Sequence, residues 1–170
     1  MGCAPRWVAL MPTRLLFVCY GNIIRSPLAE CLFRRLAVEA GLEPKYEVDS
    51  AGTSGLYDGE PPDGRMQRAA AEHGLELSGS SRPFVASDFD GFDLILAMDT
   101  DNLTALRAFA HTPADRAKLR LLRDFDPEAR PGASVPDPIA AGPAGFEHTY
   151  QIIERSVRGL LQALERPRDA

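Results

Sequence analysis

Long apolar runs, a surplus of basic residues and paired cysteines are all missing from this sequence. Its three cysteines are Cys3, Cys19 and Cys31, and none stands in a C-x-x-C pair or a cysteine–histidine cluster, so neither a metal site nor a disulfide framework is indicated. Sparse cysteine is typical of a reducing compartment. No apolar run approaches the roughly 20 residues that cross a bilayer. We therefore expect a cytoplasmic protein that neither enters a membrane nor holds a metal.

The charge balance is mildly acidic. The formal net charge of −5 argues against a general nucleic-acid binder, which needs a basic face. It does not argue against a small anionic ligand, because local potential decides that binding. The 170 residues, with 45% hydrophobic and 25% charged side chains, are typical of one soluble globular domain. We predict a flexible leader at 1–12, a domain at 13–166 and a tail at 167–170, with Met11 as an alternative start.

Short apolar runs alternate with helical patterns along the chain. We predict strands at 15–18, 46–50, 93–97 and 119–122, and helices at 26–40, 63–73, 99–109 and 146–164. Ser26 and Pro27 suit the N-cap and the first position of the first helix. Strands that alternate with helices favour an α/β fold with a parallel sheet. Ligands of such sheets bind beyond the carboxyl ends of the strands, so the turn after the first strand is the first candidate site.

That turn reads CYGNIIRS, with five residues between a cysteine and an arginine. Backbone N–H groups of a loop that wraps into a helix N-terminus can converge on one anion. Gly21 tolerates positive φ, and Asn22 is among the few other residues that do so readily. Arg25 offers a planar fork that matches two phosphate oxygens. We predict a phosphate-binding loop made by Tyr20, Gly21, Asn22, Ile23, Ile24, Arg25 and Ser26.

The same donors and the helix dipole favour a thiolate at Cys19, and Ser26 can donate a further hydrogen bond to its sulfur. Such a thiolate is suited to in-line attack on phosphorus. The alternative is a buried core cysteine and a surface Arg25, which the Gly-Asn and Ser-Pro pairs around them disfavour. A Walker A loop is excluded, because no Gly-Lys-Ser/Thr follows.

Cleavage of a phosphate ester also needs a proton for the leaving group. Asp137 lies in a loop rich in proline and glycine at 124–145, and Pro138 restricts it to extended conformations. Asp124 and Asp126 from the same loop are alternatives. The residues alone favour Asp137 only slightly.

Several motifs in a fixed order carry a resemblance over residues 14–164. They read LLFVCYGNIIRSPLAE, DSAGTSG followed by GEPPD, AAAEHG, ILAMDTDN, LLRDFDPEA, and VPDP followed by GFEHTYQIIE. The sequence thereby resembles the low-molecular-weight protein tyrosine phosphatase family. The resemblance implies a single α/β domain, with a four-stranded parallel sheet flanked by helices on both faces. It also implies hydrolysis of phosphotyrosine through a cysteinyl-phosphate, without a cofactor.

The resemblance assigns roles to individual residues. Cys19 would be the nucleophile, Arg25 the phosphate ligand, and Asp137 the general acid and later the general base. Ser26 would stabilise the thiolate, and the residues that support the loop would be Asn22, Ser50, His73 and Asp99. For His73 the alternative is a helix-end histidine at the C-terminal dipole.

The sequence departs from the family at two places. Ile24 stands where many members carry a second cysteine, so an oxidised Cys19 would lack a resolving partner in the loop, and Cys31 is expected in the core. The predicted substrate walls are Tyr20, Leu56, Tyr57, Ile139 and Ala140. Three of these positions, often aromatic in the family, are aliphatic here, and the two tyrosines would partly replace the lost stacking.

Other functions stay open at this point. A phosphoarginine phosphatase or a broader acid phosphatase of the same fold could use the altered walls. An arsenate reductase needs later cysteines, and none follows Cys31. A catalytically silent phosphate-binding adaptor is the non-enzymatic alternative. The expected partners are a phosphorylated protein substrate, with a tyrosine kinase as a further candidate, and the expected state is a monomer or a weak dimer.

Overall fold

A four-stranded parallel sheet lies at the centre of the protein. The computed structural model describes residues 11–167. Its strands are β1 (Thr13–Cys19), β2 (Tyr46–Gly52), β3 (Leu94–Ala97) and β4 (Leu119–Leu121). They are arranged in the order β2-β1-β3-β4, and all neighbours are parallel. β1 therefore lies between two strands. Its two faces are covered by other elements of the fold, which explains its continuous apolar run.

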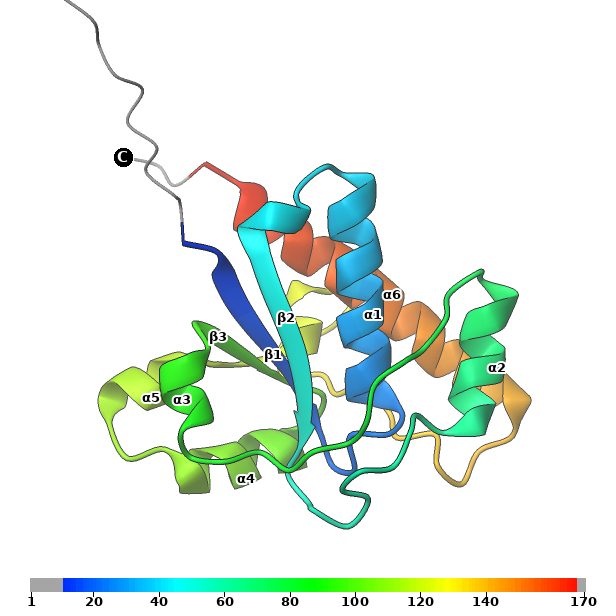
Figure 1. The fold of residues 1–170 in the computed structure, drawn as a ribbon, viewed down its shortest axis with the longest axis horizontal. Coiled ribbons are helices and arrows are strands. Elements are labelled where there is room, and N and C mark those ends of the chain that lie inside the picture. The colour runs from blue at the N-terminus through cyan, green and yellow to red at the C-terminus, as the bar shows by residue number, and fades with distance from the viewer. Residues whose placement is uncertain (1–10, 168–170) are drawn as a thin grey trace, which may run out of the picture.

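Helices cover both faces of the sheet, as Figure 1 shows. The helices are α1 (Arg25–Glu39), α2 (Gly64–Glu72), α3 (Asp88–Gly91), α4 (Thr100–Phe109), α5 (Pro113–Ala117) and α6 (Pro143–Glu165), with short 3₁₀ turns at Glu43–Lys45 and Leu122–Phe125. Leu15 and Phe17 of β1 pack with α1, α2 and α6. Leu16 and Val18 pack with α3 and α4 on the opposite face, as the alternation of side chains along a strand requires. The predicted fold class is confirmed.

Some local predictions were wrong. Ser26 does not cap α1: the helix begins at Arg25, and the preceding Ile24 makes no side-chain cap bond. The Ser26 hydroxyl is engaged by the sulfur of Cys19 instead. The last helix begins at Pro143 rather than at residue 146, since proline suits the first helical position. The short helices α3 and α5 were not predicted.

The predicted leader and tail fall largely outside residues 11–167. Cys3 and the first ten residues of the leader lie there, as do the last three residues of the chain. The first strand begins at Thr13 and the last helix ends at Glu165, while the domain boundaries stay predictions. No helix between residues 11 and 167 combines the length and the apolar composition of a membrane span.

Candidate active site

The predicted loop connects the carboxyl end of β1 to the start of α1. Asn22 has a φ of 54°, so the prediction of a left-handed residue in this turn is confirmed. Gly21 does not adopt the positive φ that a glycine tolerates. A glycine is needed at this position for a steric reason, because a Cβ here would lie 2.8 Å from Cδ2 of Tyr57. The missing side chain thus leaves room for the tyrosine ring.

The sulfur of Cys19 lies at the centre of the loop. It is 3.2 Å from the backbone nitrogen of Asn22, which donates to it. It is also 3.0 Å from the hydroxyl oxygen of Ser26. Cys19 is 2% exposed, and it nevertheless lines a small hollow at the surface. Both neighbours are placed to donate a hydrogen bond to the sulfur.

A hydrogen-bond network behind the loop fixes its shape. The Asn22 amide donates to the hydroxyl oxygens of Ser26 (2.8 Å) and Ser50 (2.9 Å), and its oxygen accepts from the backbone N–H of Arg82 (3.0 Å). The Ser50 hydroxyl donates to Glu30 of α1 at 2.6 Å. Burial raises the pKa of Glu30. Asn22 and Ser50 come together as expected, whereas Glu30 and Arg82 were not predicted.

Arg25 is buried between two carboxylates. Its side chain is 2% exposed. One terminal nitrogen donates to Asp99 at 2.7 Å and to the carbonyl of Val135 at 3.1 Å, and the other lies 3.4 Å from Asp137. The alternative of a surface Arg25 is therefore wrong. The Asp99 carboxylate compensates the buried guanidinium, and it also caps α4 by accepting from the N–H of Asn102.

The two rival acids lie in other ion pairs. The Asp126 carboxylate accepts from Arg155 at 2.7 Å and from Arg123 at 3.2 Å, and it is fully buried. Asp124 pairs with Arg120 at 3.3 Å. Of the three aspartates, Asp137 is the one that lines the hollow with the cysteine. Asp137 is therefore the one of the three carboxyl groups that lies beside the cysteine.

The structure places only part of the predicted substrate wall at the hollow. Tyr20, Tyr57 and Ile139 line it, next to Ile23, Ile24 and the arginine. Leu56, which is 68% exposed, and Ala140 are exposed to solvent and do not line it. The prediction that these two residues form part of the wall was wrong. For Leu56 the reason is that the turn at 53–59 directs Tyr57 toward Gly21 instead.

His73 does not reach the loop network, and that prediction was wrong. Its Nε2 lies 2.9 Å from a carboxylate oxygen of Glu147, and its ring stacks on Tyr150 at 4.0 Å between centroids. His73 follows the last residue of α2 and faces α6, so it joins two helices instead. Cys31 packs against the core as expected, although it is only partly buried, and burial raises the pKa of its thiol.

The hollow at Cys19 is not the largest on the molecule. A groove of about 460 Å³ lies between α2 and the start of α6, away from the cysteine. Size alone would therefore select a different place. Cys19, the buried Arg25 and Asp137 line the small hollow together, which makes the loop the candidate site.

Comparisons with known proteins place the whole domain in one family. The sequence model of the family described as "Low molecular weight phosphotyrosine protein phosphatase" matches residues 14–170. A low molecular weight protein-tyrosine-phosphatase of Streptomyces coelicolor is 45% identical over 91% of this chain and 94% of its own length. The human low molecular weight phosphotyrosine protein phosphatase is 40% identical over 87% of this chain and 93% of its own.

Solved structures show the same fold. A protein tyrosine phosphatase from Entamoeba histolytica, with Hepes in the active site, superposes with a TM-score of 0.85 at 37% identity, over 90% of this chain and 97% of that one. The Drosophila arginine phosphatase superposes with a TM-score of 0.81 at 34% identity, over 91% of this chain and 99% of that one.

Proposed function

The chain belongs to the low molecular weight phosphotyrosine protein phosphatase family, and from this premise we propose that Cys19, Arg25 and Asp137 carry the hydrolysis of phosphotyrosine in a protein. Its relatives are named protein-tyrosine-phosphatases, so the chain is a hydrolase. The observation that supports the residue assignment is one shared hollow. The cysteine, the arginine and the aspartate come from three separate parts of the sequence and line it together.

In the first step, the thiolate of Cys19 attacks phosphorus opposite the ester oxygen. The S–P bond forms as the P–O bond to the tyrosine breaks, and Asp137 gives its proton to the departing oxygen. Arg25 and the N–H groups of the loop stabilise the equatorial oxygens. Tyrosine leaves, and the phosphoryl group stays on the sulfur.

In the second step, water attacks the same phosphorus atom. Asp137, now a carboxylate, takes a proton from the water as the S–P bond breaks. Inorganic phosphate leaves and the thiolate is restored. The Ser26 hydroxyl, 3.0 Å from the sulfur, stabilises the charge that returns to it. The phosphate is also bound by the remaining residues of the loop, which are Tyr20, Gly21, Asn22, Ile23 and Ile24. The loop itself is supported by Ser50 and Asp99.

Variants of the two reacting side chains test the assignment. Cys19→Ser should lower turnover of a phosphotyrosine peptide by about 10⁴-fold or more, as nucleophile removals do. Asp137→Asn should lower it by about 10²- to 10⁴-fold. Asp124→Asn is a matched control from the same part of the chain, since its carboxylate pairs with Arg120. Full activity in Cys19→Ser would refute the proposal.

A phosphoarginine phosphatase is the second candidate. Its support is the aliphatic Ile139 at the hollow and the likeness to the Drosophila arginine phosphatase. The rings of Tyr20 and Tyr57 at the same hollow favour an aromatic substrate instead. Turnover of matched phosphotyrosine and phosphoarginine peptides distinguishes the two, and we expect the phosphotyrosine peptide to be hydrolysed faster.

The location and partners belong to the proposal as well. We expect a cytoplasmic location, since sparse cysteine suits a reducing compartment. We expect a phosphorylated protein as substrate, a tyrosine kinase as a further partner, and a monomer or a weak dimer in solution. Fractionation of cells and sedimentation of the purified chain check these expectations.

A further inference from the structure

Asp63, just before α2, touches the phosphate-binding loop. Its backbone N–H donates to the carbonyl of Ile23 at 2.7 Å. Its carboxylate caps α2 and also holds the side chain of Arg65. One carboxylate oxygen accepts from the backbone N–H and Nε of Arg65 at 2.8 and 3.1 Å, and the other accepts from a terminal nitrogen at 2.8 Å. The Arg65 guanidinium holds the pKa of the Asp63 carboxyl below its ordinary value.

The same guanidinium reaches the loop that carries the proposed acid. The other terminal nitrogen of Arg65 donates to the carbonyl of Ile139 at 2.7 Å. Ile139 lies two residues after Asp137, and its N–H donates to the Asp137 carboxylate at 3.2 Å. Arg65 therefore contacts the peptide segment on which the acid sits.

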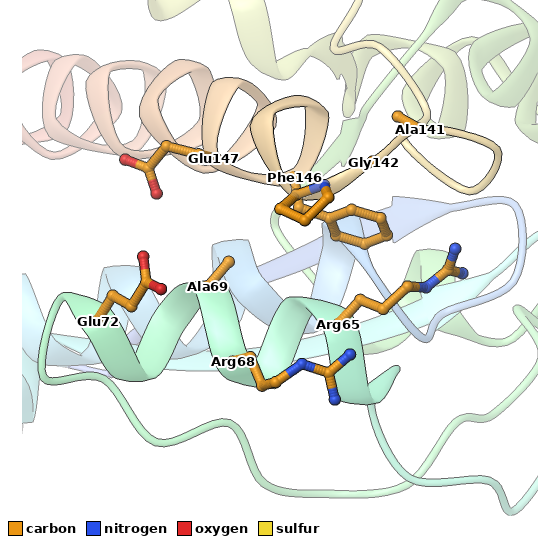
Figure 2. A pocket seen from close by; sticks show the side chains of 9 residues that line it. Arg65, Arg68, Ala69, Glu72, Ala141, Gly142, Phe146 and Glu147 are labelled. Atoms are coloured by element: carbon orange, nitrogen blue, oxygen red, sulfur yellow. The ribbon is translucent and has the colours of Figure 1, made fainter.

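A third contact fixes the guanidinium in place. It lies 4.7 Å from the centre of the Phe146 ring, a distance at which a cation is attracted to the ring face. Phe146 is 1% exposed, so the ring is held firmly by the core. In Figure 2 the Arg65 side chain extends along the Phe146 ring and beyond its edge, and Arg68 lies farther from that ring.

We propose that Arg65 is a positioning residue that sets the distance between the acid loop and the cysteine loop. Its planar fork bridges Asp63, which is bonded to the cysteine loop, and Ile139, which is bonded to the acid. The inference rests on the proposed role of Asp137 as general acid. A displacement of about 1 Å in a reacting group can cost about 100-fold in rate, so the loss of this bridge should weaken proton transfer to the leaving group.

The chemistry gives a readout that a purely structural role would not produce. The ratio kcat/KM covers only the steps up to departure of the leaving group. A phosphate ester of unsubstituted phenol needs a proton for that departure, whereas the ester of dinitrophenol leaves readily without one. A misplaced acid therefore slows the first ester and spares the second.

The experiment compares Arg65→Gln, Arg65→Lys and the control Arg68→Gln on both esters. Arg68 lies on the same helix and is exposed, and within residues 11–167 its side chain makes no hydrogen bond to Ile139 like the one that Arg65 makes. The burst of dinitrophenol that the ester releases in the first turnover counts the active sites. Every rate is then expressed per folded enzyme. We expect Arg65→Gln to lower kcat/KM for the phenyl ester by about 10- to 100-fold. The dinitrophenyl ester should change by less than about threefold, and Arg65→Lys should fall between Arg65→Gln and the unaltered protein.

A double variant separates the possible outcomes. If Arg65 acts through the acid, adding Arg65→Gln to Asp137→Asn causes no further loss for the phenyl ester. The positioning role would be overturned by any of three results. These are equal losses of kcat/KM on both esters in Arg65→Gln, additive losses in the double variant, or the same kcat/KM values in Arg65→Gln as in Arg68→Gln. If Asp137→Asn itself slows both esters equally, the acid assignment fails, and the inference about Arg65 fails with it.

Discussion

Replacing Asn22 with alanine tests how the phosphate-binding loop keeps its shape. The Asn22 side chain makes three hydrogen bonds, two to serine hydroxyls and one to the Arg82 N–H. Each contributes about 1 kcal/mol. Its φ of 54° lies in the left-handed region, where alanine costs about 1 kcal/mol more. We therefore expect Asn22→Ala to lower the free energy of unfolding by about 4 kcal/mol.

Asn22→Gly is the matched variant. Glycine loses the same three hydrogen bonds but accepts the left-handed conformation, so it should be about 1 kcal/mol more stable than alanine. Urea unfolding of both variants measures the difference. Both should also lose kcat/KM, because Ser26 loses its donor beside the sulfur. Equal stabilities of the two variants would refute the backbone argument, and an unchanged free energy of unfolding in both would refute the network.

Three further variants test other parts of the structure. Burial raises the pKa of Glu30. The group therefore stabilises the fold at a pH below its ordinary carboxyl pKa, and this contribution is lost as the pH rises through the raised value. Glu30→Gln should remove this pH dependence from the measured free energy of unfolding. Asp126→Ala should cost about 1.5–3 kcal/mol in urea unfolding, because Arg155 loses its charged hydrogen-bond acceptor but keeps an ion pair with Glu128. Burial alone would raise the pKa of Asp126, but its bonds to Arg155 and its other partners lower it overall, so its stabilisation should disappear as the pH falls through that lowered value. Gly21→Ala places a Cβ 2.8 Å from Tyr57; steady-state kinetics should show a raised KM, which Tyr57→Ala in the same chain should partly restore.

Local patterns predicted most of the fold. The apolar run at 15–18 and the helical pattern after it can be recognised from neighbouring residues in the sequence alone. No knowledge of long-range contacts is needed to predict these two elements. The short helices α3 and α5 were missed, because four or five residues are too few to show a 3.6-residue period. Ser26 had the right chemistry for an N-cap, yet the sulfur seven residues earlier competes for its hydroxyl.

Direction and distance limited the prediction of the site. A histidine at a helix end does not reveal which neighbour it faces, and His73 faces Glu147 instead of the loop. Arg82 lies 60 residues from Asn22, so no spacing in the sequence indicates their contact. Glu30 had a visible signal, because it stands one helical turn after Ser26 on the same face of α1.

The most direct test of the account is the covalent intermediate itself. The protein is mixed with a phosphotyrosine peptide, stopped within milliseconds in acid and digested, and the fragments are weighed by mass spectrometry. We expect one added phosphoryl group on the peptide that contains Cys19, and none on that peptide from Cys19→Ser. Turnover without any phosphoryl group on that peptide, or with the group on another residue, would contradict the account.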